Sequence, residues 1–210
     1  MEPAAGQPGA YFRRMNSSPP SDPKKTPFLT DMKEIQRRAR EHVLKGAVTP
    51  AYRGDLKLAV KLLNEALATE IICVLRYRRH HYMANGIHSQ AVADEFMEHS
   101  LEEQGHADQI AGRITQLGGA PDFNPEGLLM RGHAQYAEGT SLVDMIKEDL
   151  IAERVAIESY LDLIRFFGDD DPTSRRMMEE ILAKEEEHAD DLATLLETLD
   201  PRSDGSEKKH

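Results

Sequence analysis

Apolar residues recur at alternating spacings of three and four along most of the chain, the pattern of amphipathic α-helices. Four long segments carry this pattern, and a glycine or proline stands where each one ends. These predicted helices span residues 55–85, 89–117, 141–167 and 171–200. No segment has the period-two alternation of a strand. Helices this long are stable in water only when packed together, so the pattern predicts an all-α four-helix bundle.

The chain outside these helices divides into three parts. Residues 1–50 form an N-terminal extension, which begins as a tail rich in proline and glycine and continues as a short predicted helix at about 31–45. Residues 51–200 form the bundle, and residues 201–210 form a polar C-terminal tail. The connection at 118–140 can span about 70 Å when extended, so it can cross the length of the bundle.

A carboxylate interrupts the apolar stripe of every long helix. On the second and fourth helices a histidine follows that carboxylate three residues later, on the same face. The interrupting residues are Glu70, Glu103 with His106, Glu153, and Glu185 with His188. The two hairpins repeat one another as Glu-x6-Tyr, a turn, and Glu-x2-His-Ala-Asp, with the two glutamates separated by 33 residues in the first and 32 in the second.

The charges of these residues suggest what they hold. Four ionised carboxylates in an apolar core are unfavourable by several kcal/mol each unless they are neutralised. Two divalent cations would balance the four charges, and two neutral imidazoles would complete the coordination. Carboxylate and imidazole donors without thiolates suit iron or manganese, and cobalt and zinc could also bind. The pattern therefore predicts a metal centre with two iron or manganese ions.

These motifs resemble those of the ferritin-like superfamily, in particular bacterioferritin and the Dps-like miniferritins with a bacterioferritin-type di-iron site. The resemblance covers about residues 52–199. It rests on Leu62-Leu63-Asn64-Glu65, Glu103-Gln104-Gly105-His106-Ala107-Asp108 and Glu185-Glu186-Glu187-His188-Ala189-Asp190. It implies a ferritin-like bundle in which the long connection makes the second and third helices parallel.

The resemblance also implies roles. Glu103 and Glu185 would bridge the two metals. Glu70 and His106 would hold one ion, and Glu153 and His188 the other. Tyr77 falls where bacterioferritins carry a tyrosine close to the site, so we expect it there; simple core packing is the alternative.

Two departures from bacterioferritin change what we expect. The methionine that binds haem in bacterioferritin is replaced by Gln104, so no haem is predicted. The chain ends in a polar tail instead of the fifth helix that helps to close the bacterioferritin cage, so we expect a homo-oligomer that need not match that cage. A single cysteine excludes the cysteine-rich iron module of rubrerythrin-type peroxidases.

The composition of the chain limits the classes of partner that we expect it to bind. The formal net charge of −11 opposes binding of nucleic acid over the whole surface, and DNA binding is not expected. No apolar run is long enough to span a membrane, and the single cysteine fits a reducing, cytoplasmic setting.

The sequence therefore predicts an iron storage and detoxification protein with ferroxidase activity. It would oxidise Fe(II) with O₂ or H₂O₂ and store ferric mineral in an oligomeric shell. One alternative keeps the metals without storage, as a di-iron or di-manganese oxidase, peroxidase or catalase. Another is a Dps-like protein that protects DNA or associates with a compartment.

Several polar residues near the six leave alternatives open. Asp149 either accepts a hydrogen bond from a ligand histidine or lies on the surface. His99 is a core-edge residue or a further ligand. The basic run at 76–81 is interpreted as a surface or subunit contact.

Overall fold

The computed structural model describes residues 31–86 and 89–199. They belong to two units, which divide between Glu41 and His42. The first unit holds α1 (Met32–Glu41), where Arg37 pairs with Glu34 and Glu41 at 2.7 and 2.6 Å. This helix ends four residues before the predicted Lys45. The predicted N-terminal and C-terminal tails lie outside the described residues, and the boundary at residue 50 stays a prediction.

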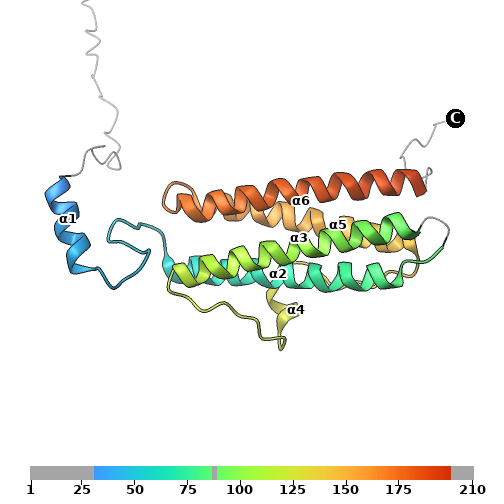
Figure 1. Ribbon diagram of the computed structural model, residues 1–210, viewed down its shortest axis with the longest axis horizontal. Helices are drawn as coiled ribbons and strands as arrows, with labels where there is room; N and C mark the ends of the chain where they lie inside the picture. The colour runs from blue at the N-terminus through green and yellow to red at the C-terminus, as the bar shows by residue number, and fades with distance from the viewer. Residues whose placement is uncertain (1–30, 87–88, 200–210) are drawn as a thin grey trace, which may run out of the picture. The chain divides into compact units, whose positions relative to one another are not determined.

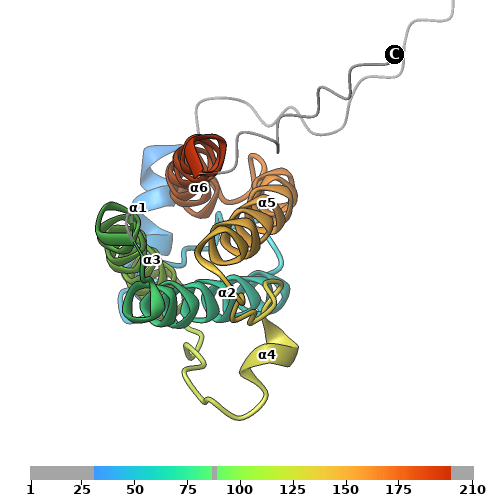
Figure 2. The same ribbon diagram turned by 90° about the vertical axis from the view of Figure 1, so that its right-hand side faces the viewer.

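The second unit is built on four long helices. They are α2 (Leu56–Met83), α3 (Ser89–Gln116), α5 (Leu142–Phe167) and α6 (Pro172–Leu199). Figures 1 and 2 show α2 beside α3 and α5 beside α6, with the two pairs packed together. The described residues contain no strand, so the predicted all-α bundle is confirmed, with helix ends within about two residues of those expected.

The capping residues explain why the helices begin where they do. An N-cap side chain accepts a bond from a backbone N–H that has no partner within the helix. Asp55 accepts the N–H of Leu58 at 3.0 Å, and Ser141 accepts that of Asp144 at 3.2 Å. Asp171 caps α6 in the same way, because it precedes Pro172 at the start of the helix and accepts the N–H of Ser174 at 2.9 Å.

The long connection carries one short helix that the sequence pattern did not predict, α4 (Leu128–Arg131). The connection returns along the length of the bundle, so α5 runs in the same direction as α3 (Figure 1). The side chains of Asn64 and Thr69 on α2 accept backbone N–H bonds from the connection at 2.7 and 2.9 Å. At Gly132 the backbone packs so closely on α2 that a Cβ would lie 2.4 Å from Ile72. The connection is thus fixed to α2 along its length.

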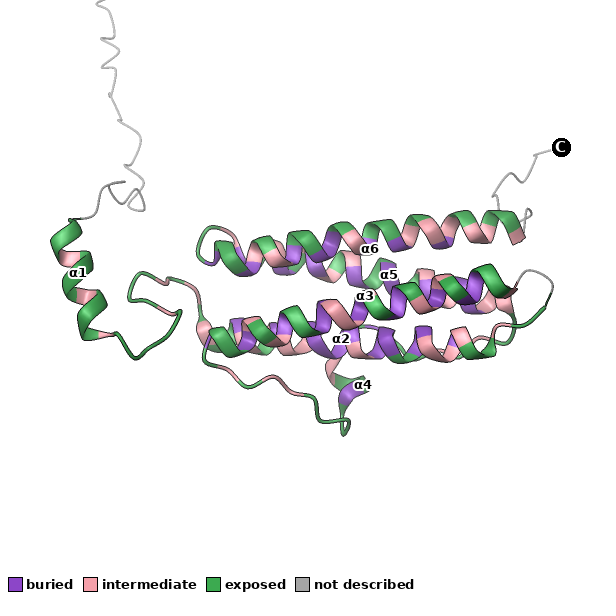
Figure 3. Ribbon diagram, in the orientation of Figure 1, coloured by how far each residue is buried: buried purple, intermediate pink, exposed green. Residues whose placement is uncertain are grey.

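Figure 3 shows buried residues recurring along all four long helices. The apolar ones among them form two clusters. Leu63, Ile110 and Met178 represent one cluster, and Ile72 and Phe96 the other. Along each long helix the change from one cluster to the other falls near the stripe-interrupting glutamate. The apolar core therefore encloses a polar layer at mid-bundle.

Candidate metal centre

The six residues selected from the sequence lie in this layer, and each long helix contributes at least one. None is more than 6% exposed. Glu70 comes from α2, Glu153 from α5, and the two Glu-x2-His pairs from α3 and α6: Glu103, His106, Glu185 and His188. Three-residue spacing on a helix puts each histidine on the same face as its glutamate.

The ligand atoms fall into two groups, each with atoms within 4.8 Å of one another. One group contains Glu70 and His106, the other contains Glu153 and His188, and both contain Glu103 and Glu185. The two shared carboxylates lie between the two ends. This arrangement could hold two adjacent cations that share the carboxylates of Glu103 and Glu185.

Each of the six side chains has a buried nitrogen or oxygen without a hydrogen-bond partner. These atoms are Glu70 Oε2, Glu103 Oε1, His106 Nδ1, Glu153 Oε2, both Glu185 oxygens and His188 Nδ1. His106 Nδ1 lies 3.3, 3.4 and 3.0 Å from oxygens of Glu70, Glu103 and Glu185. Ligands about 2.1 Å from one ion at right angles are about 3 Å apart, so this spacing suits a shared cation. The donors therefore fit two metal ions.

Two buried tyrosines join the hairpins across the centre. Tyr77 on α2 donates to Glu153 on α5, and Tyr160 on α5 donates to Glu70 on α2. Both tyrosines are at most 1% exposed. Tyr77 thus lies beside the centre, where the sequence comparison expected it, and Tyr160 holds the matching position in the second hairpin.

The partner of His188 is not the one considered from the sequence. Nε2 of His188 lies 2.7 Å from Glu102 Oε2, while Nδ1 faces the carboxylates of the pocket. A carboxylate on the far nitrogen fixes the tautomer and orientation of a metal-binding histidine. Glu102 immediately precedes Glu103 in the sequence. Whether the side chain of Glu102 points toward His188 depends on how α3 packs against α6.

Asp149 instead forms a buried ion-pair cluster. Its two oxygens lie 2.9 Å from Arg76 Nη2 and 2.7 Å from His80 Nδ1, and all three residues are at most 2% exposed. Arg76 also donates to the carbonyl of Gln135 at 2.6 Å, and His80 Nε2 lies 3.1 Å from that of Glu138. The prediction that the basic run is a surface is therefore wrong for Arg76 and His80, which fix the connection to the bundle.

Burial and neighbouring charge shift the pKa values of the metal-free centre. Burial, and then the charge of Glu185, raises the pKa of Glu103 and of Glu153. Burial alone would lower the pKa of His188, but the adjacent carboxylate of Glu185 and the charge of Glu153 raise it to about 9. The centre therefore retains protons at neutral pH, and cations must displace them.

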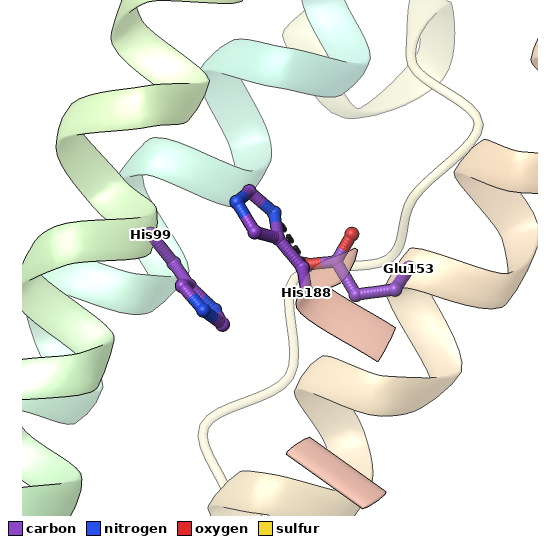
Figure 4. Close-up of side chains that lie close together, drawn as sticks. All are labelled: His99, Glu153 and His188. Carbon is purple, nitrogen blue, oxygen red and sulfur yellow. Dashed lines mark ion pairs between the residues drawn. The ribbon is translucent and has the colours of Figure 1, made fainter. Parts of the chain in front are cut away.

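His99 lies against one end of the pocket. Its ring stacks on that of His188, with centroids 4.1 Å apart, and Figure 4 shows both rings near Glu153. His99 is 2% exposed, and its Nδ1 lies 3.2 Å from the Tyr77 hydroxyl. Burial lowers the pKa of His99 to about 3, so its imidazole is neutral. His99 is therefore a buried residue at the edge of the pocket, and its role as a further ligand stays a prediction.

Comparison with known proteins identifies the family to which this fold belongs. The ferritin-like domain of the ferritin family matches residues 60–201, about two thirds of the chain. The chain therefore belongs to the ferritin family. A bacterioferritin of Mycobacterium tuberculosis, BfrA, is 30% identical over 142 residues, which cover 67% of this chain and 85% of that protein.

Solved structures with a similar fold lead to the same family. A dodecameric thioferritin of Bacteroides fragilis, a bacterioferritin-related protein, is 28% identical with a TM-score of 0.69, over 84% of this chain and 99% of the other. Rhodobacter capsulatus bacterioferritin, solved with a metal-free dinuclear site and haem iron, is 27% identical with a TM-score of 0.63, over 71% and 89%. The expected resemblance to bacterioferritins and miniferritins is confirmed.

Two expectations concern features beyond the centre. Gln104 donates to Asp108 on its own helix at 3.3 Å, and the absence of haem stays a prediction. Between residues 31 and 199, apart from 87–88, no helix is long and apolar enough to cross a membrane.

Proposed function

We propose that the chain is a ferroxidase that binds two Fe²⁺ per subunit as substrate and passes their electrons to O₂ or H₂O₂. The observation that carries the proposal is the set of unpartnered, buried donor atoms on six side chains from four helices. Such atoms cost about 1–3 kcal/mol each when nothing pairs with them, and more when charged. Two cations would neutralise the four carboxylates and bond to both imidazoles.

The protein would contribute a pair of adjacent positions and a low-dielectric pocket. Glu103 and Glu185 would bridge the ions, with Glu70 and His106 at one end and Glu153 and His188 at the other. Paired metals allow two electrons to leave together, which suits reduction of O₂ or a peroxide. Tyr77 and Tyr160 would hold the end carboxylates in the ionised, metal-binding orientation.

We further propose that the ferric product is stored inside a homo-oligomeric shell in the cytoplasm. The family relationship supports this step, because the relative from Mycobacterium tuberculosis is a bacterioferritin and the thioferritin of similar structure is a dodecamer. Manganese suits the same donors, so metal analysis of the natively purified assembly belongs with the test.

Anaerobic titration with Fe²⁺ followed by O₂ or H₂O₂ tests the activity. We expect tight binding of two irons per chain in the dinuclear pocket and their rapid oxidation. Glu103→Ala should lose both, because it removes a ligand of both ions, while Glu98→Ala, an exposed change on the same helix, should leave both intact. Binding of fewer than two irons per chain, or unchanged oxidation in Glu103→Ala, contradicts the ferroxidase. Electron microscopy after iron loading tests storage: a compact oligomer without a mineral core contradicts it.

A further inference from the structure

A third group of metal-binding side chains lies where α3 and α6 meet, beside the dinuclear pocket. Glu95 and His99 of α3 and Asp191 of α6 offer atoms that all lie within 4.8 Å of one another. His99 Nε2 is 3.3 Å from Glu95 Oε1 and 3.9 Å from Asp191 Oδ2. One imidazole and two carboxylates are a common donor set for first-row divalent cations.

Hydrogen bonding determines which form of His99 faces this group. The Tyr77 hydroxyl has one proton and donates it to Glu153. With that proton directed at Glu153, the hydroxyl oxygen is available to accept from His99 Nδ1, 3.2 Å away, an arrangement that assigns the ring proton to Nδ1. Nε2 is left with a lone pair directed at two carboxylates. Lone pairs and anions at these distances repel unless a cation lies between them.

Exposure at this group increases from the histidine outward. His99 is 2% exposed, whereas the side chains of Glu95 and Asp191 are 32% and 46% exposed. A cation from solvent would therefore meet the two carboxylates first and lose its remaining water at the buried imidazole. The dinuclear pocket itself is far more enclosed, since none of its six residues exceeds 6%.

Successive groups of donors share residues from the surface to the pocket. His99 belongs to the outer group and also to a second group with Glu153 and His188. Glu153 and His188 in turn belong to the nearer end of the dinuclear pocket. Figure 4 shows these three side chains converging from α3, α5 and α6. A cation can thus exchange one ligand at a time along the series without entering the apolar core.

We propose that Glu95, His99 and Asp191 form a third divalent-cation site, from which an ion passes to the dinuclear pocket. The supply of the pocket rests on the proposed function; the binding of a cation at this group does not. Its cation is of the class that the pocket accepts, a first-row divalent ion.

Crystals of the full chain grown anaerobically with Co²⁺ test the binding. We expect a cobalt anomalous peak among the three residues in the wild type and none in Glu95→Gln/Asp191→Asn. The matched variant Asp94→Asn/Asp190→Asn removes the same two charges from exposed neighbours on the same helices and should keep the peak. A wild type without this peak, or a double variant that keeps it, overturns the site. Peaks among the six pocket residues report on the dinuclear centre independently.

Stopped-flow oxidation of Fe²⁺ tests the supply. We expect Glu95→Gln/Asp191→Asn to slow the first turnover by about tenfold, because the cation loses its ligands on the way to the pocket, while the two irons of the dinuclear pocket still bind. Asp94→Asn/Asp190→Asn should match the wild type. A double variant that oxidises Fe²⁺ at the wild-type rate overturns the supply role.

Discussion

The α2–α3 and α5–α6 hairpins place the same side chains at the centre but surround them differently. Both provide an end glutamate, a tyrosine for the opposite hairpin and a Glu-x2-His pair. His99 lies four residues before Glu103, however, and the corresponding position before Glu185 is Ile181, part of an apolar cluster. The duplication therefore makes the two metal positions alike, while the next layer of residues makes them different.

The two hairpins also differ in other residues that surround the centre. Asp191 follows His188 by three residues, where Gln109 follows His106, and Glu102 stands before Glu103 where Lys184 stands before Glu185. Acidic and imidazole groups thus gather at the end of the pocket held by Glu153 and His188. We infer from this difference that cations and protons reach the centre mainly through that end.

Arg76 should show the largest effect on stability. The pair Arg76–Asp149 has no counterpart in the repeat, whose matching positions are Ser159 and Ala66. Arg76→Met would leave Asp149 buried without its arginine, which costs about 3–5 kcal/mol. Ser159→Ala should cost less than about 0.5 kcal/mol, because the hydroxyl bonds only to its own helix. Urea unfolding of both variants measures the difference; a loss below about 1 kcal/mol in Arg76→Met contradicts the role of the pair.

The contrast also explains what sequence could predict. The six centre residues and the helix ends were found because they interrupt or terminate a periodic pattern, and such local signals survive without knowledge of packing. Arg76, His80 and Glu102 gave no such signal. The contacts of Arg76 and His80 depend on the backbone carbonyls of residues 135 and 138, whose positions follow from the path of the connection. Helix α4 arises in that same connection, where no apolar period exists.

Replacing the two tyrosines separates the two ends of the centre. Tyr77→Phe and Tyr160→Phe each remove one hydrogen bond to an end carboxylate, worth about 1.5–3 kcal/mol, so each should weaken one cation by roughly 10- to 100-fold. Only Tyr77 also accepts from His99. Tyr77→Phe should therefore weaken Co²⁺ at the Glu95–His99–Asp191 site as well, whereas Tyr160→Phe should not. Calorimetric titration with Co²⁺ gives these affinities, and equal losses at the third site would show that the hairpins do not differ in this respect.

The smallest expected effect is the pH dependence at the Glu153–His188 end. The pKa of His188 is raised to about 9 in the metal-free chain, so the ring is protonated below that pH. A cation needs the Nδ1 lone pair and must displace that proton, so affinity should fall as pH falls from 9, by up to about tenfold per pH unit.

Glu102 helps to hold that proton, because its carboxylate lies 2.7 Å from His188 Nε2. Glu102→Gln should lower the pKa of His188 and flatten the pH dependence at this end, while Glu98→Gln, an exposed change one turn earlier, should leave the slope unchanged. Co²⁺ absorption titrations between about pH 6.5 and 8 measure the slopes. A wild-type affinity that is constant over this range would mean that His188 is already neutral. An unchanged slope in Glu102→Gln would mean that the proton on His188 is held from the pocket side, by Glu185 and Glu153. The acidic residues outside the pocket at this end would then affect the binding of cations rather than the binding of protons.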